Sequence, residues 1–422
     1  MGRNAGPVAL VARLFLSGWR GVLKMRRVLI PTVVVAAAVA PVFWRHCRAG
    51  DLTSDHEVHV GYIRARKMPT YPLYHLSVDG LGKCLEIYAS AAQAPGSWLP
   101  FQRHAETLAN MAEVERLRRT SALVLTLACA ATAAISAGYL ASRTGASTFT
   151  LTATCLGLAV AMPLPTIAVL EYLTSPHLQY PKPGQGLYLG QISPNVWHNP
   201  TTIFAMPFAI SLYWAAARAI DRFTMRAAVA LAVASILSVL AKPNYALALL
   251  PCVGIALAMS PLPVADRILR LMVAFILPLA VLWGQAAILV GPGRTPAEEA
   301  LISPFEVWKR FSQNIPLSAF VGIAFPLCVV LAYRGGFAAE TPLKLAWAAL
   351  ATGVFQYAVL IERERAGDGN WGWGMMIADH VLFLASCDYL FRQRLDVRKA
   401  ICAGAFLLHV GCGIMDVCNS HY

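Results

Sequence analysis

Two polar segments, each bordering a long apolar run, carry side chains that could do chemistry. The first is Asp55-His56-Glu57-Val58-His59, and the second runs from residue 190 to residue 200 and includes Asn195, Trp197, His198 and Asn199. Carboxylates beside an apolar wall can serve as general bases, and imidazoles and amides can orient hydroxyl groups. We therefore expect a catalytic or recognition site where the segments meet, with Asp55 and Glu57 as candidate bases.

Other candidates for substrate binding come from the same two segments and from three polar interruptions further along the chain. Together they are His56, His59, His75, Asn195, Trp197, His198, Asn199, Lys242, Arg363, Arg365, Asn370 and Trp371. Lysine and arginine near a membrane suit phosphate groups. A structural salt bridge explains Lys242 equally well, because an ammonium group in apolar sequence needs a partner. Asn199 and Pro200 also fit a helix start, as N-cap and first helical residue.

The sequence allows a metal site without establishing one. Asp55, His56 and His59 form a plausible ligand set for a divalent ion, although His-x-x-His alone is a weak pattern. No Cys-x-x-Cys or Cys/His spacing indicates zinc, and nothing else indicates a cofactor.

The composition predicts an integral membrane protein. The 422 residues are 57% hydrophobic and 14% charged, whereas soluble domains carry about 25% charge. The net charge of +13 fits arginine-rich loops that face anionic membrane lipids. Because the arginines are scattered and form no basic stripe with aromatic residues, nucleic acid is not expected as a partner. No internal repeat divides the chain, so residues 1–422 are predicted to form one membrane domain.

The apolar runs predict the fold class, an all-α polytopic transmembrane helix bundle. A bilayer core about 30 Å thick needs roughly 20 apolar residues per helix. About eleven spans follow, near residues 28–44, 121–142, 149–170, 201–220, 227–241, 244–260, 269–290, 317–333, 343–361, 375–391 and 400–418. The run 227–259 is too long for one helix, and we place a break at Lys242-Pro243-Asn244 because proline interrupts a helix.

Charge asymmetry predicts the orientation. Six lysines and arginines precede the first span, so the positive-inside rule keeps the N-terminus cytoplasmic. The chain is then a multi-pass protein of the cell membrane, with a long first extracytoplasmic loop at about 45–120. Residues 101–118 alternate charged and apolar groups at helical spacing, which predicts an amphipathic helix on the membrane surface. Both polar segments lie on the extracytoplasmic side.

Three ionisable residues, Asp379, His380 and Asp388, fall inside or near the tenth span. Ionisable groups within a membrane are functional candidates by default, because burying them away from water is costly.

Several motifs resemble those of known membrane enzymes. Asp55-His56-Glu57 followed by Pro72-Leu73-Tyr74-His75 resembles the first external loop of the GT-C superfamily of membrane glycosyltransferases. The runs from residue 188 to 201, Ala241-Lys242-Pro243-Asn244 and Gly369-Asn370-Trp371-Gly372-Trp373-Gly374 are similar to segments of a related family of bacterial membrane proteins. The superfamily often has two adjacent acidic residues, whereas His56 separates Asp55 from Glu57 here.

The resemblance implies an enzyme that moves a sugar from a polyprenyl-phosphate donor to an extracytoplasmic glycan or lipid acceptor, with inversion, in envelope glycan synthesis. Asp55 or Glu57 would be the base. Lys242, Arg363 and Arg365 would stabilise the leaving phosphate electrostatically. Sugar hydroxyls would be oriented by His75, Asn195 and His198, and a sugar ring would stack on Trp197 or Trp371.

Two other classes of function compete with this one. A transporter or flippase for a lipid-linked sugar also has broken helices and intramembrane charge. The chain lacks the paired interrupted helices that such transporters often carry, and its long first loop favours an enzyme. The amphipathic segment at 101–118 would also suit a scaffold subunit of an envelope complex.

Overall fold

The computed structural model describes residues 7–48, 55–67, 69–92, 113–164, 187–290, 300–312, 314–363, 367 and 369–419. Within these ranges the chain is almost entirely helical, as the apolar periodicity predicts. The exception is a short antiparallel pair of strands, β1 (Ala300–Ile302) and β2 (Leu360–Glu362), in which Ala300 is opposite Glu362.

Among the described residues, six helices are long and apolar enough to cross a membrane. They are α1 (Pro7–Arg48), α5 (Glu113–Arg143), α8 (Pro200–Asp221), α11 (Val264–Val290), α17 (Gly372–Phe391) and α18 (Val397–Asn419). A seventh candidate is the pair α13 (Ile315–Gly322) and α14 (Ala324–Ala332), which is bent by 72°. The other elements are α2 (His56–Arg64), α3 (Leu73–Ala92), α6 (Thr148–Val160), η1 (Leu187–Gly190), α9 (Met225–Ala241), α10 (Pro243–Ala258), α12 (Glu306–Phe311), α15 (Arg334–Phe337) and α16 (Thr341–Val359).

Each of the eleven predicted segments coincides with helical structure, but not each is a candidate span. Within the segment predicted at 149–170, α6 ends at Val160 and residues 165–170 lie outside the described ranges. Helices α6, α9 and α10 are shorter apolar helices of 13, 17 and 16 residues. At 1.5 Å per residue they measure about 20–26 Å, less than a bilayer core. Helix α16 has 19 residues but is not among the candidate spans. Length and composition therefore support six spans among the described residues, or seven with the bent pair.

The helices form one bundle with α17 at its centre. Every residue from Gly372 to Leu390 is buried, and α17 packs against α10, α14 and α16. By contrast α11 and α18 lie at the periphery and expose large apolar side chains such as Leu277, Trp283 and Leu407. An apolar surface of this extent is unfavourable in water, so it fits contact with lipid.

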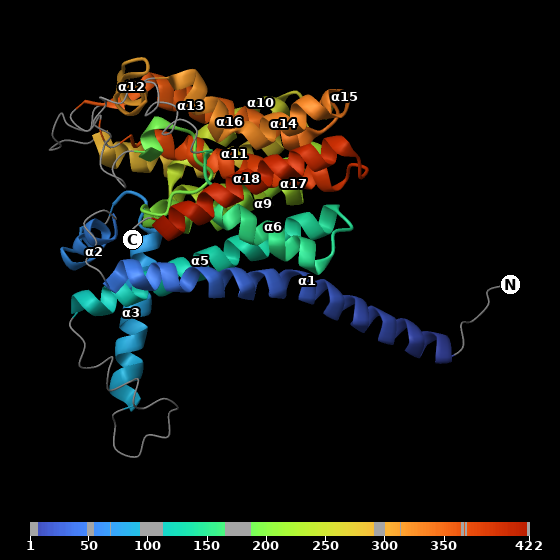
Figure 1. Cartoon of the computed structure of the whole chain (residues 1–422), viewed down its shortest axis with the longest axis horizontal. Helices are drawn as coiled ribbons and strands as arrows, with labels where there is room; N and C mark the ends of the chain where they lie inside the picture. The colour runs from blue at the N-terminus through green and yellow to red at the C-terminus, as the bar shows by residue number, and fades with distance from the viewer. Residues whose placement is uncertain are drawn as a thin grey trace.

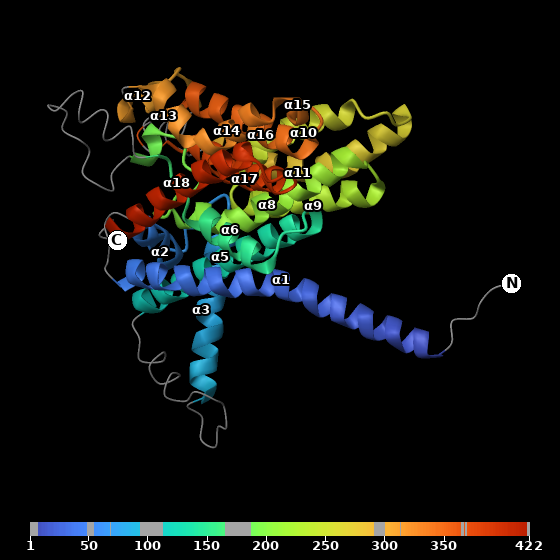
Figure 2. The same ribbon diagram turned by 45° about the vertical axis from the view of Figure 1, so that its right-hand side comes forward.

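Two helices extend beyond the bundle (Figures 1 and 2). The N-terminal part of α1 projects past one end, because 42 helical residues measure about 60 Å, twice the thickness of a bilayer core. Helix α3 projects sideways, across the direction of α1. Of the amphipathic helix predicted at 101–118, residues 113–118 form the first turns of α5, and residues 101–112 lie outside the described ranges.

Two predicted helix boundaries are confirmed. Helix α9 ends at Ala241 and α10 begins at Pro243, with Lys242 extended between them at φ −168° and ψ 118°. Helix α8 begins at Pro200, and the side chain of Asn199 accepts a hydrogen bond from the N–H of Thr202. Both breaks use a proline in the first turn of a helix, where its missing N–H costs nothing.

The end of α6 packs closely against α18 at a glycine. A Cβ atom on Gly413 would overlap the carbonyl oxygen of Val160 and lie 3.3 Å from Met162. The N–H of Met162 also donates to the carbonyl of His409 (3.0 Å), and His409 Nδ1 donates to the carbonyl of Met162 (2.7 Å).

The substitution Gly413→Ala is expected to destabilise the protein by about 1–3 kcal/mol, because the two backbones must separate to admit a methyl group. Gly411→Ala in the same helix is the control, since a Cβ there meets nothing within 4 Å. Unfolding in mixed detergent micelles measures both. Equal stability of the two variants would contradict this account of the packing.

Candidate functional site

A chain of hydrogen bonds links the two polar segments at one end of the bundle. Asn199 Nδ2 donates to the carboxylate of Asp55 (2.8 Å), and the N–H of Asp55 donates to the carbonyl of His198 (3.1 Å). Asp55 directly precedes α2, while Asn199 is the N-cap of α8. The carboxylate therefore lies at a helix N-terminus, where the backbone dipole favours negative charge.

Asn199 holds this end of α8 together. Its Oδ1 accepts from the N–H of Thr202 (2.9 Å) and from the hydroxyls of Thr201 and Thr202 (both 2.9 Å). Because Oδ1 faces the helix, Nδ2 points the other way, toward Asp55. The capping geometry thus also orients the donor that holds the carboxylate.

Lys242 lies behind Asn199, inside the protein. Its ammonium group donates to Asn199 Oδ1 (3.0 Å) and to the hydroxyls of Thr201 (2.9 Å) and Thr202 (2.7 Å). It also lies 4.8 Å from the ring centroid of Trp373 and is 2% exposed. Three hydrogen bonds occupy all three N–H donors of an ammonium group. Direct contact with phosphate, as predicted for Lys242, does not fit this geometry, and the lysine instead fixes Asn199.

Burial lowers the pKa of Lys242 to about 7, although the negative charge of Asp55 opposes the shift. The unfolded chain holds this proton up to about pH 10.5. Between pH 7 and 10.5 the unfolded state therefore binds more protons, and stability rises with pH.

From pH 7 to 9 the wild type is expected to gain roughly 2 kcal/mol of stability that the variant Lys242→Met does not gain. Thermal unfolding in nanodiscs across this pH range measures the difference between the two proteins. Parallel pH profiles would show that Lys242 is fully charged in the folded protein.

Trp373 connects Lys242 to the third polar segment. Its indole Nε1 donates to Asn370 Oδ1 (3.2 Å), Asn370 Nδ2 donates to Glu362 (2.8 Å), and Asn244 Nδ2 donates to the carbonyl of Asn370 (2.8 Å). The glycines allow this approach. Gly369 has φ +58°, and a Cβ on Gly374 would lie 2.7 Å from the carbonyl of Asn244. The glycine-rich run thus makes a close backbone contact with the start of α10.

His198 borders the same cluster. Its ring lies 5.8 Å from that of Trp373. Burial, together with the charge of Lys242, lowers the pKa of His198 to about 4, so the imidazole is neutral at physiological pH. The structure thus brings together Asp55, His198, Asn199, Lys242 and Asn370.

The two candidate bases have different surroundings. Arg118 Nε donates to Glu57 at 2.7 Å, which ties α2 to α5, with the two side chains 25% and 33% exposed. Asp55 accepts a hydrogen bond from the neutral amide of Asn199 (2.8 Å).

His59 and His75 form a buried pair. His59 Nδ1 and His75 Nε2 are 2.9 Å apart, and the two residues are 7% and 0% exposed. Burial lowers the pKa of His75 to about 4. The pair packs among Tyr62 and Tyr74 and joins α2 to α3, so both rings, which the sequence predicts to bind substrate, lie buried between helices. The side chain of His56 lies outside the described part of the structure.

The remaining predicted residues do not join the cluster. Asn195 donates to the carbonyls of Leu158 (2.7 Å) and Ala161 (2.8 Å), closing the end of α6. Trp197 is 4% exposed and packs on Phe43, 5.7 Å between ring centroids, so it cannot stack on a sugar at the surface. Trp371 is half-buried and Arg363 is exposed at the end of β2, while Arg365 lies outside the described residues.

No three His, Cys, Asp or Glu side chains among the described residues are placed to hold a metal ion. The predicted set of Asp55, His56 and His59 includes a side chain, that of His56, outside the described part of the structure, so this set stays a prediction.

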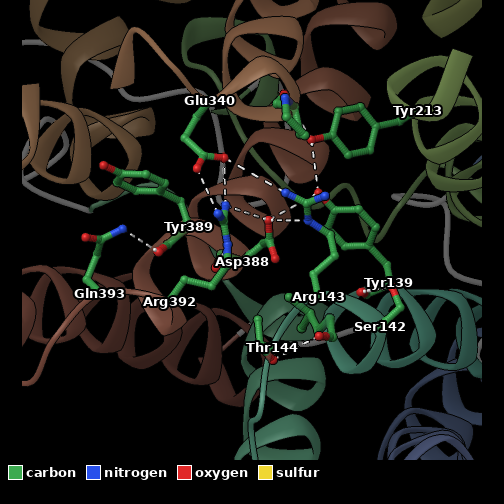
Figure 3. Close-up of polar contacts among 12 residues, drawn as sticks. Tyr139, Ser142, Arg143, Thr144, Tyr213, Glu340, Asp388, Tyr389, Arg392 and Gln393 are labelled. Carbon is green, nitrogen blue, oxygen red and sulfur yellow. Dashed lines mark hydrogen bonds and ion pairs between the residues drawn. The ribbon is translucent and has the colours of Figure 1, made fainter. Parts of the chain in front are cut away.

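A second polar cluster lies at the opposite end of α17 (Figure 3). Asp388, 1% exposed, accepts from Arg143 Nε (2.8 Å) and Arg392 Nη2 (3.2 Å). Glu340 accepts two hydrogen bonds from Arg392, both 2.8 Å, which hold the pKa of Glu340 below its usual value. Acids and guanidinium groups alternate and clamp α5, α16 and α17 together, so we interpret this cluster as structural.

Comparison of the chain with family models, with curated proteins and with solved structures finds no match. The function must therefore be argued from the cluster itself.

Sequence reasoning missed three residues of the cluster, Thr201, Thr202 and Trp373. The threonines follow the N-cap, where hydroxyls commonly stabilise a first turn, and nothing local in the sequence indicates that Lys242, 41 and 40 residues further on, is their second partner. Trp373 lies in the glycine-rich run 369–374. The sequence predicts Trp371 as the substrate-binding indole of this run, because sequence alone does not say which indole faces Lys242.

Proposed function

We propose that the chain is a membrane glycosyltransferase that moves a sugar from a polyprenyl-phosphate donor to a glycan or lipid acceptor. The observation that carries the proposal is the carboxylate of Asp55, held at 2.8 Å by Asn199 just beyond α1 and beside a buried ammonium group. An ionised carboxylate offers about four lone-pair sites, so a hydrogen bond from Asn199 does not prevent Asp55 from taking a proton.

In the proposed reaction, Asp55 takes the proton of an acceptor hydroxyl as its oxygen attacks the anomeric carbon. The bond from that carbon to the phosphate oxygen breaks, and polyprenyl phosphate leaves with the electron pair. The product has inverted configuration. Arg363, exposed at the end of β2, is a candidate to stabilise the leaving phosphate, while Lys242 positions Asn199 and therefore Asp55.

Glu57 is a poorer base in this proposal. Its ion pair with Arg118 would have to break before it could accept a proton. In this proposal Asp55 is therefore the base.

Donor turnover tests the proposal directly. The purified chain, reconstituted in vesicles, is given a panel of radiolabelled polyprenyl-phosphate hexoses and pentoses, with an envelope extract as acceptor. Transfer of the label into the extract, with release of polyprenyl phosphate, is expected. Label that stays on the lipid but becomes accessible from the other side of the vesicle would contradict the proposal and favour a flippase.

Thiol labelling of intact cells tests the sidedness that this reaction requires. In a background without native cysteines, Val58→Cys and Arg363→Cys are expected to react with an impermeant reagent, because both positions are exposed. Leu395→Cys, 89% exposed near the other end of α17, is expected to stay unlabelled. The opposite pattern would place the cluster in the cytoplasm and exclude an extracytoplasmic reaction.

A further inference from the structure

A groove opens on the surface of the bundle between α14, α15, α18 and the end of α17. Tyr389 and Gln393, which lie close to Asp388 in Figure 3, belong to its wall. The groove is therefore at the opposite end of α17 from the cluster around Asp55. Its volume is about 950 Å³, which is that of about thirty water molecules in the liquid. It can therefore hold a headgroup together with part of a hydrocarbon chain.

The groove has an apolar wall that ends at two arginines. Its apolar part includes Leu327 of α14 and Ile401 of α18. Arg334 begins α15 two residues after α14 ends, and Arg398 lies in the first turn of α18. Arg398 Nη1 donates to the carbonyl of Ala332 (3.4 Å), the last residue of α14. Both arginines thus lie at the same end of the groove.

The charges at this end are unbalanced. Among the described residues, no Asp or Glu lines the groove. Arg334 is exposed, and its side chain has no hydrogen bond or ion pair with a described residue. Arg398 uses one of its five N–H donors on Ala332. Asp396, outside the groove wall, accepts from the hydroxyl of Tyr333 (3.1 Å) and interacts electrostatically with Arg398. One acid does not neutralise two arginines, so an anion would complement this end.

We propose that the groove binds an anionic phospholipid of the surrounding membrane, with its phosphate at Arg334 and Arg398 and an acyl chain along the wall at Leu327. A guanidinium group can bind two phosphate oxygens at once, and basic pockets between membrane helices suit anionic headgroups. A zwitterionic lipid brings a cation that the arginines repel. A soluble phosphate compound leaves the apolar wall in contact with water, which is unfavourable. The inference does not depend on the proposed transfer reaction.

Native mass spectrometry of the full chain in detergent micelles tests the site. The probes are dioleoyl phosphatidylglycerol and dioleoyl phosphatidylcholine, which share their acyl chains and differ in headgroup charge. We expect the first molecule of phosphatidylglycerol to bind about 5–25-fold more tightly, because each arginine near a membrane surface contributes about fivefold to the binding of an anionic lipid. Equal affinity for the two lipids would overturn the proposal.

Single arginine variants locate the headgroup. Arg334→Gln and Arg398→Gln are each expected to weaken phosphatidylglycerol binding about fivefold and to leave phosphatidylcholine binding unchanged. Arg394→Gln is the matched control, because Arg394 is exposed at the same end of the bundle and does not line the groove. An equal loss in the control would show that surface charge in general attracts the lipid. Unchanged binding in both groove variants would place the lipid elsewhere, and either result would overturn the proposal.

A charge-preserving variant separates the headgroup contact from misfolding. Arg334→Lys keeps the positive charge and is expected to retain most of the phosphatidylglycerol binding that Arg334→Gln loses. An equal loss in both variants would contradict a role for the charge.

The apolar wall is tested with glycerol 1-phosphate, which carries the phosphate without acyl chains. We expect it not to displace phosphatidylglycerol at about tenfold the concentration of the lipid, because it gains nothing from the apolar wall. Complete displacement would show that the groove takes a soluble phosphate compound and would overturn the assignment to a lipid.

Discussion

Replacing Asp55 with asparagine is expected to reduce sugar transfer by about 10²–10⁴-fold, the usual contribution of a general base. Asparagine has nearly the same shape, and its carbonyl can still accept the hydrogen bond from Asn199 that Asp55 accepts at 2.8 Å. The fold of this end of the bundle is therefore expected to survive. What is lost is the group that takes the acceptor proton.

Glu57→Gln is the matched variant, because it removes a carboxylate two residues away. Glutamine cannot form the ion pair with Arg118, yet an exposed pair of this kind contributes only about 0–1 kcal/mol. Transfer by Glu57→Gln is expected within a few-fold of the wild type, measured as release of polyprenyl phosphate from the same labelled donor. If Glu57→Gln is inactive and Asp55→Asn is active, the base has been assigned to the wrong acid. Full activity in both variants would exclude a carboxylate base from this loop.

The second large effect concerns stability rather than transfer. Asp388→Asn is expected to destabilise the protein by about 3 kcal/mol, toward the lower end of the range for breaking a buried ion pair. The side chain of Asp388 is 1% exposed, while its partners Arg143 and Arg392 are 27% and 28% exposed. Without this acid the two guanidinium groups share only Glu340 (Figure 3), and water screens part of their repulsion.

Unfolding in mixed micelles measures this loss against Glu306→Gln. Glu306 forms an exposed pair with Arg310, 43% and 48% exposed, and its loss is expected to change stability by less than about 0.5 kcal/mol. Folded Asp388→Asn protein should retain transfer activity, because Asp388 and Asp55 lie at opposite ends of the bundle. A loss of activity without a loss of stability would show that the clamp is more than structural.

The features that the sequence predicts correctly depend on residues that are neighbours along the chain. The helix break at Lys242-Pro243, the N-cap at Asn199 and the close approach at Gly374 all follow from local backbone chemistry. The number of spans was less predictable. Helices α6, α9 and α10 are apolar enough but too short, since proline and polar residues end them early.

The sequence by itself determined that the chain is helical and apolar, where its helices break, and which polar residues interrupt the apolar runs. Only the tertiary structure decided which of those residues meet. Asp55 and Asn199 are 144 positions apart and Lys242 is 43 beyond Asn199, and no local pattern encodes such pairings. The physical reason is that a buried polar group must find a partner wherever packing brings one. Accordingly, Lys242 lies inside the protein and donates to Asn199, and Glu57 pairs with Arg118. Asn195 donates to carbonyls at the end of α6, and Asp55 accepts a hydrogen bond from Asn199.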